Sequence, residues 1–461
     1  MNEPTNNLSS RREFLINTSK FAAVGALAGV ALPHVHAAEN NTIQVALIGC
    51  GGRGTGAANN ALSVSNGNVK LVAMADVFQD RLNTSYGAIK RDHPETVDVP
   101  EDRKFIGFDA YKNAMDCLKP GDVAIFTTPL AFRWVHFEYA IKKNLNVFME
   151  KPLTADGPTS KRMLKLAEES VAKNLKVGVG LMSRHSKALQ ELHARIQDDI
   201  GDIILMRGYR MAPGPLASQF SEKWPGNPSE LLWQLQRFHS FLWASGGNYS
   251  DFYIHHIDHC CWMKNAWPVK AQALGGRHYR YDYVDQNFDN YSVEYTFADG
   301  SKFIMDGRNM NGANAIYSSY AHGSKGMAIL SKNGDCGTPS STYKGQNPTK
   351  KNLIWESTDT SSPYQNEWDA LIAAIRNDKP HNETKNGVYA SIATSMGRMA
   401  AHTAQEITWD DMLNCDHEFA PNADKFTMDS PPPVASDKNG KYPVPQPGLN
   451  KKYEYEPTVT V

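Results

Sequence analysis

A glycine-rich segment, Gly49-Cys50-Gly51-Gly52-Arg53-Gly54, has the residue types and spacing of a phosphate-binding turn. It follows the apolar run 43–48 and precedes a helix-like segment at 57–62, which is the order strand, turn, helix. In such a turn the first glycine allows the sharp bend and the middle one lets the backbone approach a pyrophosphate; the last lets the helix pack against the strand. The helix N-terminus would offer free N–H groups to the phosphates. The segment predicts a dinucleotide site; the alternative is a turn that binds nothing.

An acidic residue stands where it would decide which dinucleotide binds. A second apolar run, 69–75, ends on Asp76, about 20 residues beyond the turn. Its carboxylate would accept hydrogen bonds from the hydroxyls of the adenosine ribose. Because a carboxylate repels a 2′-phosphate, Asp76 favours NAD over NADP as the cofactor.

A lysine follows another buried-strand pattern, Asn146–Met149, in the sequence Glu150-Lys151-Pro152-Leu153. Ligands bind outside the carboxyl ends of parallel strands, so Lys151 is predicted to point into a crevice between domains. An ammonium group there can bind a ribose and a substrate hydroxyl together and take part in proton transfer. The alternative is an exposed lysine at the end of a strand.

Asp251 and His255 are four residues apart and would share one face of a helix. A carboxylate beside an imidazole orients the ring and raises its basicity, which suits a general base that takes a hydroxyl proton. His256, Asp258 and His259 are also of metal-ligand type. However, neighbouring positions on a helix point about 100° apart, and His259 pairs with His255 only. We therefore expect no metal site here.

The stretch 233–239, which contains Arg237, mixes aromatic and hydrogen-bonding side chains. Such a mixture suits a sugar-binding surface, because aromatic faces stack and polar groups bind hydroxyls. It is equally typical of a packed interface helix. Both interpretations remain open from the sequence.

The elements that would position these residues form two patterns. Residues 42–152 alternate strand and helix, which predicts a doubly wound parallel sheet of Rossmann type with right-handed crossovers. Residues 153–410 predict an α+β domain with a large, mostly antiparallel open sheet, which includes the hairpin signal at 298–301. The whole chain is thus of the α/β class. A late helix at 388–404 can pack back on the first domain.

Bulk properties limit the function classes. A length of 461 residues exceeds one ordinary core and indicates two domains. Lys and Arg number 48 against 49 Asp and Glu, so a basic face for nucleic acid is not expected. The six cysteines match no zinc or disulfide framework, which indicates buried free thiols.

The N-terminus matches an export signal. Ser10-Arg11-Arg12-Glu13-Phe14-Leu15 has the twin-arginine pattern, Phe21–Leu32 is apolar but short for a bilayer span, and Val35-His36-Ala37 fits a cleavage site. We expect a signal peptide over 1–37 and a folded periplasmic protein that has no stable membrane insertion. Such a protein would load its cofactor before export and hold it tightly. The alternative is a cytosolic helix with two chance arginines.

The C-terminal segment 411–461 is rich in proline and polar residues. It predicts an extended tail, which is either disordered or lies across a neighbouring surface.

Three motifs make the chain resemble the Gfo/Idh/MocA family of NAD(P)-dependent oxidoreductases, up to about Gln405. They are the glycine turn with Asp76; Thr127-Thr128-Pro129 with His136, closing at Glu150-Lys151-Pro152-Leu153; and Gly246–Asp251 leading to His255–Asp258. The resemblance implies NAD as cofactor, a small carbohydrate substrate, a homo-oligomer formed through the open sheet, and a cis bond before Pro152.

The resemblance also assigns residues. The catalytic group would be Lys151, Asp251 and His255. The cofactor would contact Gly49, Gly51, Gly52, Arg53, Gly54, Asp76, Thr128, Pro129, His136, Glu150 and Lys151. Weaker substrate candidates are Arg184, Arg237, Tyr253 and His256. Tyr253 stands where many members have glycine, so we expect it to narrow the pocket or to place a phenol near the substrate.

The expected reaction is hydride transfer between a carbinol carbon of a sugar or polyol and a nicotinamide. His255 and Lys151 would manage the hydroxyl proton, and Asp251 would orient His255. One alternative is a glycoside hydrolase with recycled NAD, which oxidises, eliminates, hydrates and reduces in turn. Another is a non-catalytic scaffold that holds a nucleotide and binds sugars.

Overall fold

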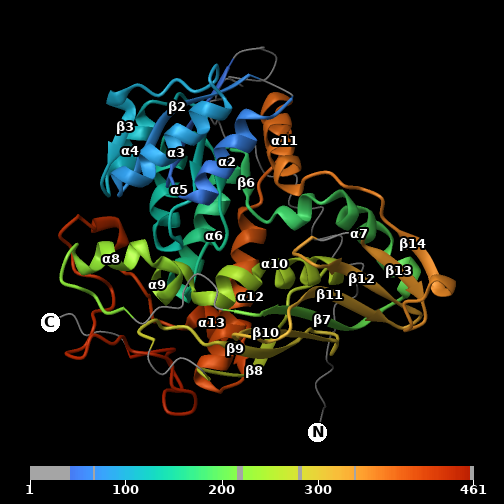
Figure 1. The fold of residues 1–461 in the computed structure, drawn as a ribbon. Coiled ribbons are helices and arrows are strands. Elements are labelled where there is room, and N and C mark those ends of the chain that lie inside the picture. The colour runs from blue at the N-terminus through green and yellow to red at the C-terminus, as the bar shows by residue number, and fades with distance from the viewer. Residues whose placement is uncertain (1–41, 66–67, 215–221, 279–282, 337–338, 457–461) are drawn as a thin grey trace, which may run out of the picture. The chain divides into compact units, whose positions relative to one another are not determined.

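Two sheets organise the chain in the computed structural model, which describes residues 42–65, 68–214, 222–278, 283–336 and 339–456 (Figure 1). The export motif and cleavage site predicted within 1–37 lie outside these residues. The first sheet is parallel throughout, and the second is mostly antiparallel, as the sequence predicted.

The first sheet has the strand order β3-β2-β1-β4-β5-β6. Its strands are β1 (Ile43–Ile48), β2 (Val69–Asp76), β3 (Lys104–Ile106), β4 (Val123–Phe126), β5 (Asn146–Met149) and β6 (Val177–Val179). The strands are almost continuously apolar because helices cover both faces. The last strand, β6, comes after residue 152, where the sequence pattern had ended the first domain.

The helices of this sheet are α2 (Gly52–Leu62), α3 (Gln79–Asp92), α4 (Ala110–Asp116), α5 (Arg133–Lys142) and α6 (Gly157–Ala172). Successive residues of β1 face opposite sides, so Val45 and Leu47 pack with α2 and α3, whereas Ala46 and Ile48 pack with α4 and α5.

A helix from the end of the chain completes one face of this sheet. α11 (Pro363–Arg376) lies beside α2 (Figure 1), and its Trp368 ring stacks on Phe148 of β5 at 4.5 Å between centroids. Gln365 also exchanges two hydrogen bonds with Asn60 of α2. The first core therefore closes only when distant parts of the chain come together.

The second sheet has the order β14-β13-β12-β11-β7-β10-β9-β8-β15, with β7 and β10 as its parallel pair. Its strands are β7 (Ile203–Ala212), β8 (Lys270–Gly276), β9 (Asn290–Thr296), β10 (Lys302–Asn309), β11 (Ile316–Gly323), β12 (Gly326–Lys332), β13 (Ser341–Lys344), β14 (Leu353–Glu356) and β15 (Ile407–Thr408). The sequence pattern missed β11, β13, β14 and β15, because these strands are short or rich in serine, tyrosine and threonine.

Helices pack on one face of the second sheet (Figure 1). They include α7 (Lys187–Ile200), α10 (Gly247–Lys264) and α12 (Thr384–Thr403), and the chain adds the shorter α8 (Glu230–Gln236), α9 (Leu242–Ser245) and α13 (Trp409–Asn414). On the other face, Leu274 is 78% exposed and Ile316 is 39% exposed.

Within the described ranges, no helix is both long and apolar enough to cross a membrane. All six cysteines are free thiols.

The tail packs across the body of its own chain, close to α8 in Figure 1. The predicted boundary at 411 falls inside α13, so the irregular segment begins at Cys415. Val434 accepts a hydrogen bond from the Gln234 side chain at 2.7 Å, and the Tyr442 hydroxyl donates to Glu230 at 2.8 Å. Between the two sequence-based expectations, disorder and docking, the described tail residues show docking.

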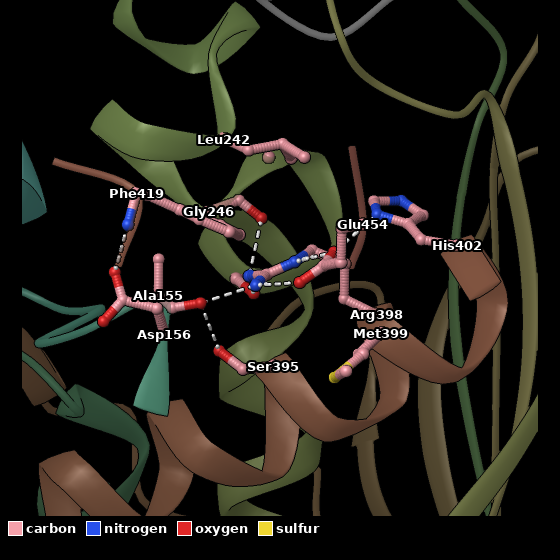
Figure 2. A network of polar contacts seen from close by, with 12 residues as sticks. Ala155, Asp156, Leu242, Gly246, Ser395, Arg398, Met399, His402, Phe419 and Glu454 are labelled. Carbon is pink, nitrogen blue, oxygen red and sulfur yellow. Dashed lines mark hydrogen bonds and ion pairs between the residues drawn. The ribbon is translucent and has the colours of Figure 1, made fainter. Parts of the chain in front are cut away.

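A buried arginine, Arg398 of α12, joins the tail to both halves of the chain (Figure 2). Its guanidinium pairs with Glu454 of the tail through two contacts of 2.8 Å. The same group donates to the carbonyl of Ala155, just after Pro152, and to the carbonyl of Gly246, where α10 begins. Burial alone would raise the pKa of Glu454, but Arg398 and His402 lower it to about 2.

We predict that Glu454→Gln lowers the free energy of unfolding by about 3–5 kcal/mol, because it leaves the Arg398 charge buried without compensation. Glu456→Gln, an exposed tail position, is the matched control and should change little. Urea denaturation at neutral pH measures both. The Glu454 contribution should be complete above the unfolded carboxyl pKa of about 4.3 and be lost as the pH falls toward about 2. Equal stabilities of the two variants would contradict this.

Candidate active site

A cavity of about 270 Å³ lies at the carboxyl ends of the first sheet's strands. The glycine turn, Asp76 and the loop Thr127–Pro129 line it from the first sheet, and Leu235, Phe238 and His239 line it from the other side. This is the crevice in which doubly wound folds bind their ligands.

The glycine turn has the geometry that its sequence predicts. Gly49 adopts a φ of +96°, and a Cβ there would lie 2.8 Å from the backbone of Thr127. A Cβ at Gly54 would collide with the Gly49 carbonyl, so this glycine permits the close packing of α2 on β1. Gly51 and Gly52 border the cavity, and nothing lies within 4 Å of a Cβ built on either. The first N–H groups of α2 thus face an open space of the right kind for phosphates.

Asp76 ends β2 beside this turn. Its carboxylate accepts hydrogen bonds from the Cys50 N–H at 2.6 Å and from the Phe78 N–H at 2.9 Å. Burial raises the pKa of this carboxyl, although both N–H groups oppose the shift. A carboxylate has about four acceptor positions, so capacity remains for ribose hydroxyls. The residues present therefore fit a dinucleotide with a free 2′-hydroxyl.

Arg133 fixes the Thr127–Pro129 loop, because its guanidinium donates hydrogen bonds to the carbonyls of Phe126 and Thr128 at 2.9 Å each. The Thr128 hydroxyl contacts Nδ1 of His136 at 3.3 Å. Burial and the charge of Arg133 lower the pKa of His136 to about 3, so its ring is neutral near pH 7. Both Thr128 and His136 line the cavity.

A second cavity of about 310 Å³ adjoins the first. The two share Arg53 and the Thr127–Pro129 loop on one side and Phe238 and His239 on the other. Arg53 leaves the glycine turn to bind Glu150 at 2.6 Å. Glu150 and Lys151 line the second cavity rather than the first. The Lys151–Pro152 bond is cis.

Lys151 is held by one residue of α10. Its Nζ donates to the Asp251 carbonyl at 2.5 Å and to Oδ1 of the same residue at 3.1 Å. The other carboxylate oxygen, Oδ2, lies 3.1 Å from Nε2 of His239. Burial alone would raise the pKa of Asp251, but Lys151 and His239 hold it well below its usual range. Asp251 therefore stays ionised and bridges a cation and an imidazole.

This arrangement corrects one prediction. The sequence paired Asp251 with His255, whereas the structure pairs Asp251 with Lys151 and His239. His255 does line the second cavity, but its Nδ1 is buried without a hydrogen-bond partner among the described residues. Burial lowers the pKa of His255 to about 4, an effect that Asp335 only partly offsets. The ring is therefore neutral near pH 7.

The four weaker substrate candidates lie elsewhere, since none of them lines either cavity in the described part of the chain. Arg184 pairs with the buried Asp258 at 2.8 Å. Arg237 lies over the Trp233 ring and pairs with Glu222. Tyr253 is fully buried and packs on Tyr249 and Tyr291, so it neither narrows the cavity nor brings a phenol to it. His256 stacks on Tyr317.

The structure also shows how the side chains of metal-ligand type on the histidine-rich helix α10 are arranged. Among the residues that the structure describes, no three His, Cys, Asp or Glu side chains are grouped so that they could hold a metal ion. Asp258 is engaged by Arg184, and Nε2 of His259 contacts the Ser319 hydroxyl at 2.7 Å.

The second cavity contains functional groups that the motifs did not reveal. They are Arg210 of β7, Asp335 after β12, Tyr364 of α11, Phe252 of α10 and His239. Arg210 lies 3.7 Å from the Tyr317 ring centroid and 3.7 Å from Asp335. Only His239 had a sequence signal, because it ends the aromatic and polar stretch at 233–239; the others lack a motif.

No family model and no curated protein matches this sequence. Solved structures do. Aldose–aldose oxidoreductase from Caulobacter crescentus, complexed with glycerol, has a TM-score of 0.60 and 14% identity over 80% of this chain and 100% of that one. Scyllo-inositol dehydrogenase from Lactobacillus casei, with NAD(H) and scyllo-inositol bound, has a TM-score of 0.58 and 19% identity over 80% and 100%. Myo-inositol 2-dehydrogenase from Lactobacillus plantarum has a TM-score of 0.57 and 19% identity over 80% and 99%.

At these identities the likeness establishes the fold. The chain has the two-sheet fold of these sugar and polyol dehydrogenases along essentially their whole length.

Proposed function

We propose that the protein is an NAD-dependent oxidoreductase of the Gfo/Idh/MocA family, acting on a carbinol group of a sugar or polyol. The observation that carries this proposal is the junction of the two cavities. A site suited to a dinucleotide opens there into a cavity that holds Lys151, Asp251 and His255. The dehydrogenases of the same fold, which include one that binds NAD(H) and scyllo-inositol, support it.

NAD would supply the hydride acceptor for the carbinol carbon. The glycine turn and the α2 N-terminus would hold its pyrophosphate, and Asp76 would bind the adenosine ribose. Thr128 and Pro129 lie at the junction through which the nicotinamide end would reach the second cavity.

The chain's own residues would position the substrate. Lys151, held by Asp251, presents its ammonium to the second cavity, where it can bind the reacting hydroxyl and stabilise negative charge on that oxygen. His255 is neutral near pH 7 and can accept a hydrogen bond or a proton there. The remaining lining supplies Arg210, Asp335 and Tyr364 as partners for further hydroxyl groups.

We also propose that the nucleotide is retained through turnover. The segment 230–240 covers the first cavity, and Arg81 of α3 ties it down through the Gln236 carbonyl at 3.3 Å. The tail holds this cover from outside through Gln234 and Glu230. Retention would suit export of the folded, loaded protein to the periplasm, which the twin-arginine motif suggests.

The exposed face of the second sheet, with Leu274 and Ile316, is proposed as the contact between copies of this chain in a homo-oligomer.

The proposal is tested on the mature protein as purified. The released nucleotide is identified by mass spectrometry. The protein is then incubated with D-glucose, D-galactose, myo-inositol and 4-nitrophenyl β-D-glucoside. The absorbance of reduced nicotinamide reports oxidation of the substrate, and the absorbance of nitrophenol reports cleavage of the glycoside. Reduction of bound nicotinamide by a sugar or polyol supports the proposal. Nitrophenol release without net reduction would favour the recycled-NAD glycosidase, and bound NAD with neither reaction would favour a scaffold.

We predict that Lys151→Ala lowers turnover by about 100-fold or more while most NAD affinity is kept, because the ammonium acts on the reacting oxygen rather than on the nucleotide phosphates. The exposed Lys119→Ala is the control. Single-turnover reduction of the bound nucleotide measures the first effect, and fluorescence titration with NADH measures the second. Unchanged turnover would exclude this role for Lys151.

We predict that Phe426→Ala speeds loss of the bound nucleotide about tenfold. This tail ring packs at 6.1 Å on both Phe108 and Phe132, which line the nucleotide cavity, and aromatic pairs contribute about 0.5–1.5 kcal/mol each. The release rate is followed by gel filtration and nucleotide assay over time. Met428→Ala, at a partly exposed tail position, should release nucleotide at the wild-type rate. A Phe426→Ala protein that retains nucleotide equally well would contradict the prediction.

A further inference from the structure

His239 occupies a place that neither the motifs nor the expected catalytic group explains. It is the one imidazole among the described residues that lines both cavities, the first with Asp76 and the glycine turn, the second with Lys151 and His255. A ring at this junction would meet both the nicotinamide end of the cofactor and the reacting carbon of the substrate. This inference rests on the proposed function for the identity of those two ligands.

The backbone at His239 is fixed before any ligand binds. The Asn287 side chain donates to the His239 carbonyl at 3.0 Å, and the Gln286 N–H donates to the next carbonyl, that of Ser240, also at 3.0 Å. The ring itself stacks on Phe252 at 5.4 Å between centroids and lies against the tilted ring of Phe238 at 3.9 Å. A ring that is held by two aromatic neighbours and by its main chain is preorganised in the way that proton-transfer groups require.

The carboxylate partner belongs to His239, not to His255. Oδ2 of Asp251 lies 3.1 Å from Nε2 of His239, while Oδ1 binds Lys151 at the same distance. Because Asp251 stays ionised, its Oδ2 can accept a hydrogen bond from Nε2 of His239, and Nδ1 is the ring nitrogen left to face a substrate. His255 has no such partner in the described structure; its Nδ1 is buried and unpaired.

Other charged groups face this ring from the surrounding elements. Arg53 comes from α2, Lys151 follows β5, and Arg210 and Asp335 also line the second cavity. Arg53 is paired with Glu150, and Arg210 with Asp335, so their charges are largely compensated. Asp251 is the carboxylate in direct contact with His239.

We propose that His239 is a catalytic residue, the acid–base group that exchanges the proton of the reacting hydroxyl, with Asp251 as its orienting carboxylate. Bound NAD would supply the acceptor for the hydride that the carbinol C–H bond gives up when the substrate is oxidised. The O–H bond breaks, its proton passes to Nδ1 of His239, and a C=O bond forms. In the reverse direction the imidazolium returns the proton to the alkoxide oxygen, while Lys151 stabilises negative charge on that oxygen in both directions.

The test separates proton transfer from positioning. A glutamine amide can replace Nε2–H as a donor to Asp251 but cannot accept a proton at neutral pH. His239→Gln should therefore keep the nucleotide content and NADH affinity of the wild type and lose at least about 100-fold in single-turnover reduction with the sugar or polyol that the wild type uses best. His193→Asn, on α7 away from both cavities, is the control. The pH–rate profile of the wild type should change in the variant, because the variant lacks the nitrogen that accepts the proton.

Recovery of most activity in His239→Gln, or an unchanged pH profile, would overturn the inference while leaving the proposed function intact. If the wild type reduces its nucleotide with none of the sugars or polyols named above, both this inference and the proposed function are overturned.

A second measurement, which needs no turnover, uses the nucleotide-free protein with isotope-labelled histidine. Nuclear magnetic resonance should show the His239 proton on Nε2, and Asp251→Ala should abolish this preference. A proton on Nδ1 in the wild type would exclude the dyad.

Discussion

The buried ion pair between Arg398 and Glu454 is the contact on which the active-site geometry depends. One guanidinium binds the loop that follows Lys151, the start of α10 and the C-terminal tail. The group is completely buried, so its charge must be met inside the protein, and Glu454 meets it through two nitrogen–oxygen contacts. The tail is therefore part of the folded core rather than an appendage. Its loss would leave uncompensated the guanidinium that binds both segments next to the candidate catalytic residues.

Inside the candidate site, the carboxylate of Asp251 likewise joins separate segments of the chain. It joins Lys151, which follows β5 of the parallel sheet, to His239, which precedes α10, and its own side chain comes from α10. Three separate segments thus converge on one carboxylate, whose low pKa keeps it charged. A cation and an imidazole occupy its two oxygens, and His255 does not contact it; burial keeps His255 a neutral ring in a cavity that also contains Arg210 and Asp335. The geometry supports two imidazoles with different roles.

Several features could be predicted from local patterns alone. The glycine turn, Asp76 and the strand before Lys151 are contiguous signals, because a turn, a helix N-terminus and a strand end are formed by neighbouring residues. Their placement around one cavity follows from the parallel sheet, whose strand ends meet at one edge. Local patterns failed where strands are short and polar, as in β11 and β13, and where a helix joins a distant core, as α11 does with Trp368 against Phe148.

The residues of the candidate site also divide into those that local patterns identify and those that depend on distant parts of the chain. The sequence by itself determined which residues form the glycine turn, where Lys151 stands, and that Asp251 and His255 share a helix. The tertiary structure alone decided that Asp251 faces His239 rather than His255, that Arg184 is occupied by Asp258, and that Tyr253 belongs to the core. The physical reason is that spacing along a helix fixes the direction of a side chain but not what lies opposite it. Here His239 comes from the segment 230–240, Arg184 follows β6 and Tyr291, which packs on Tyr253, lies on β9; their positions relative to α10 depend on long-range packing.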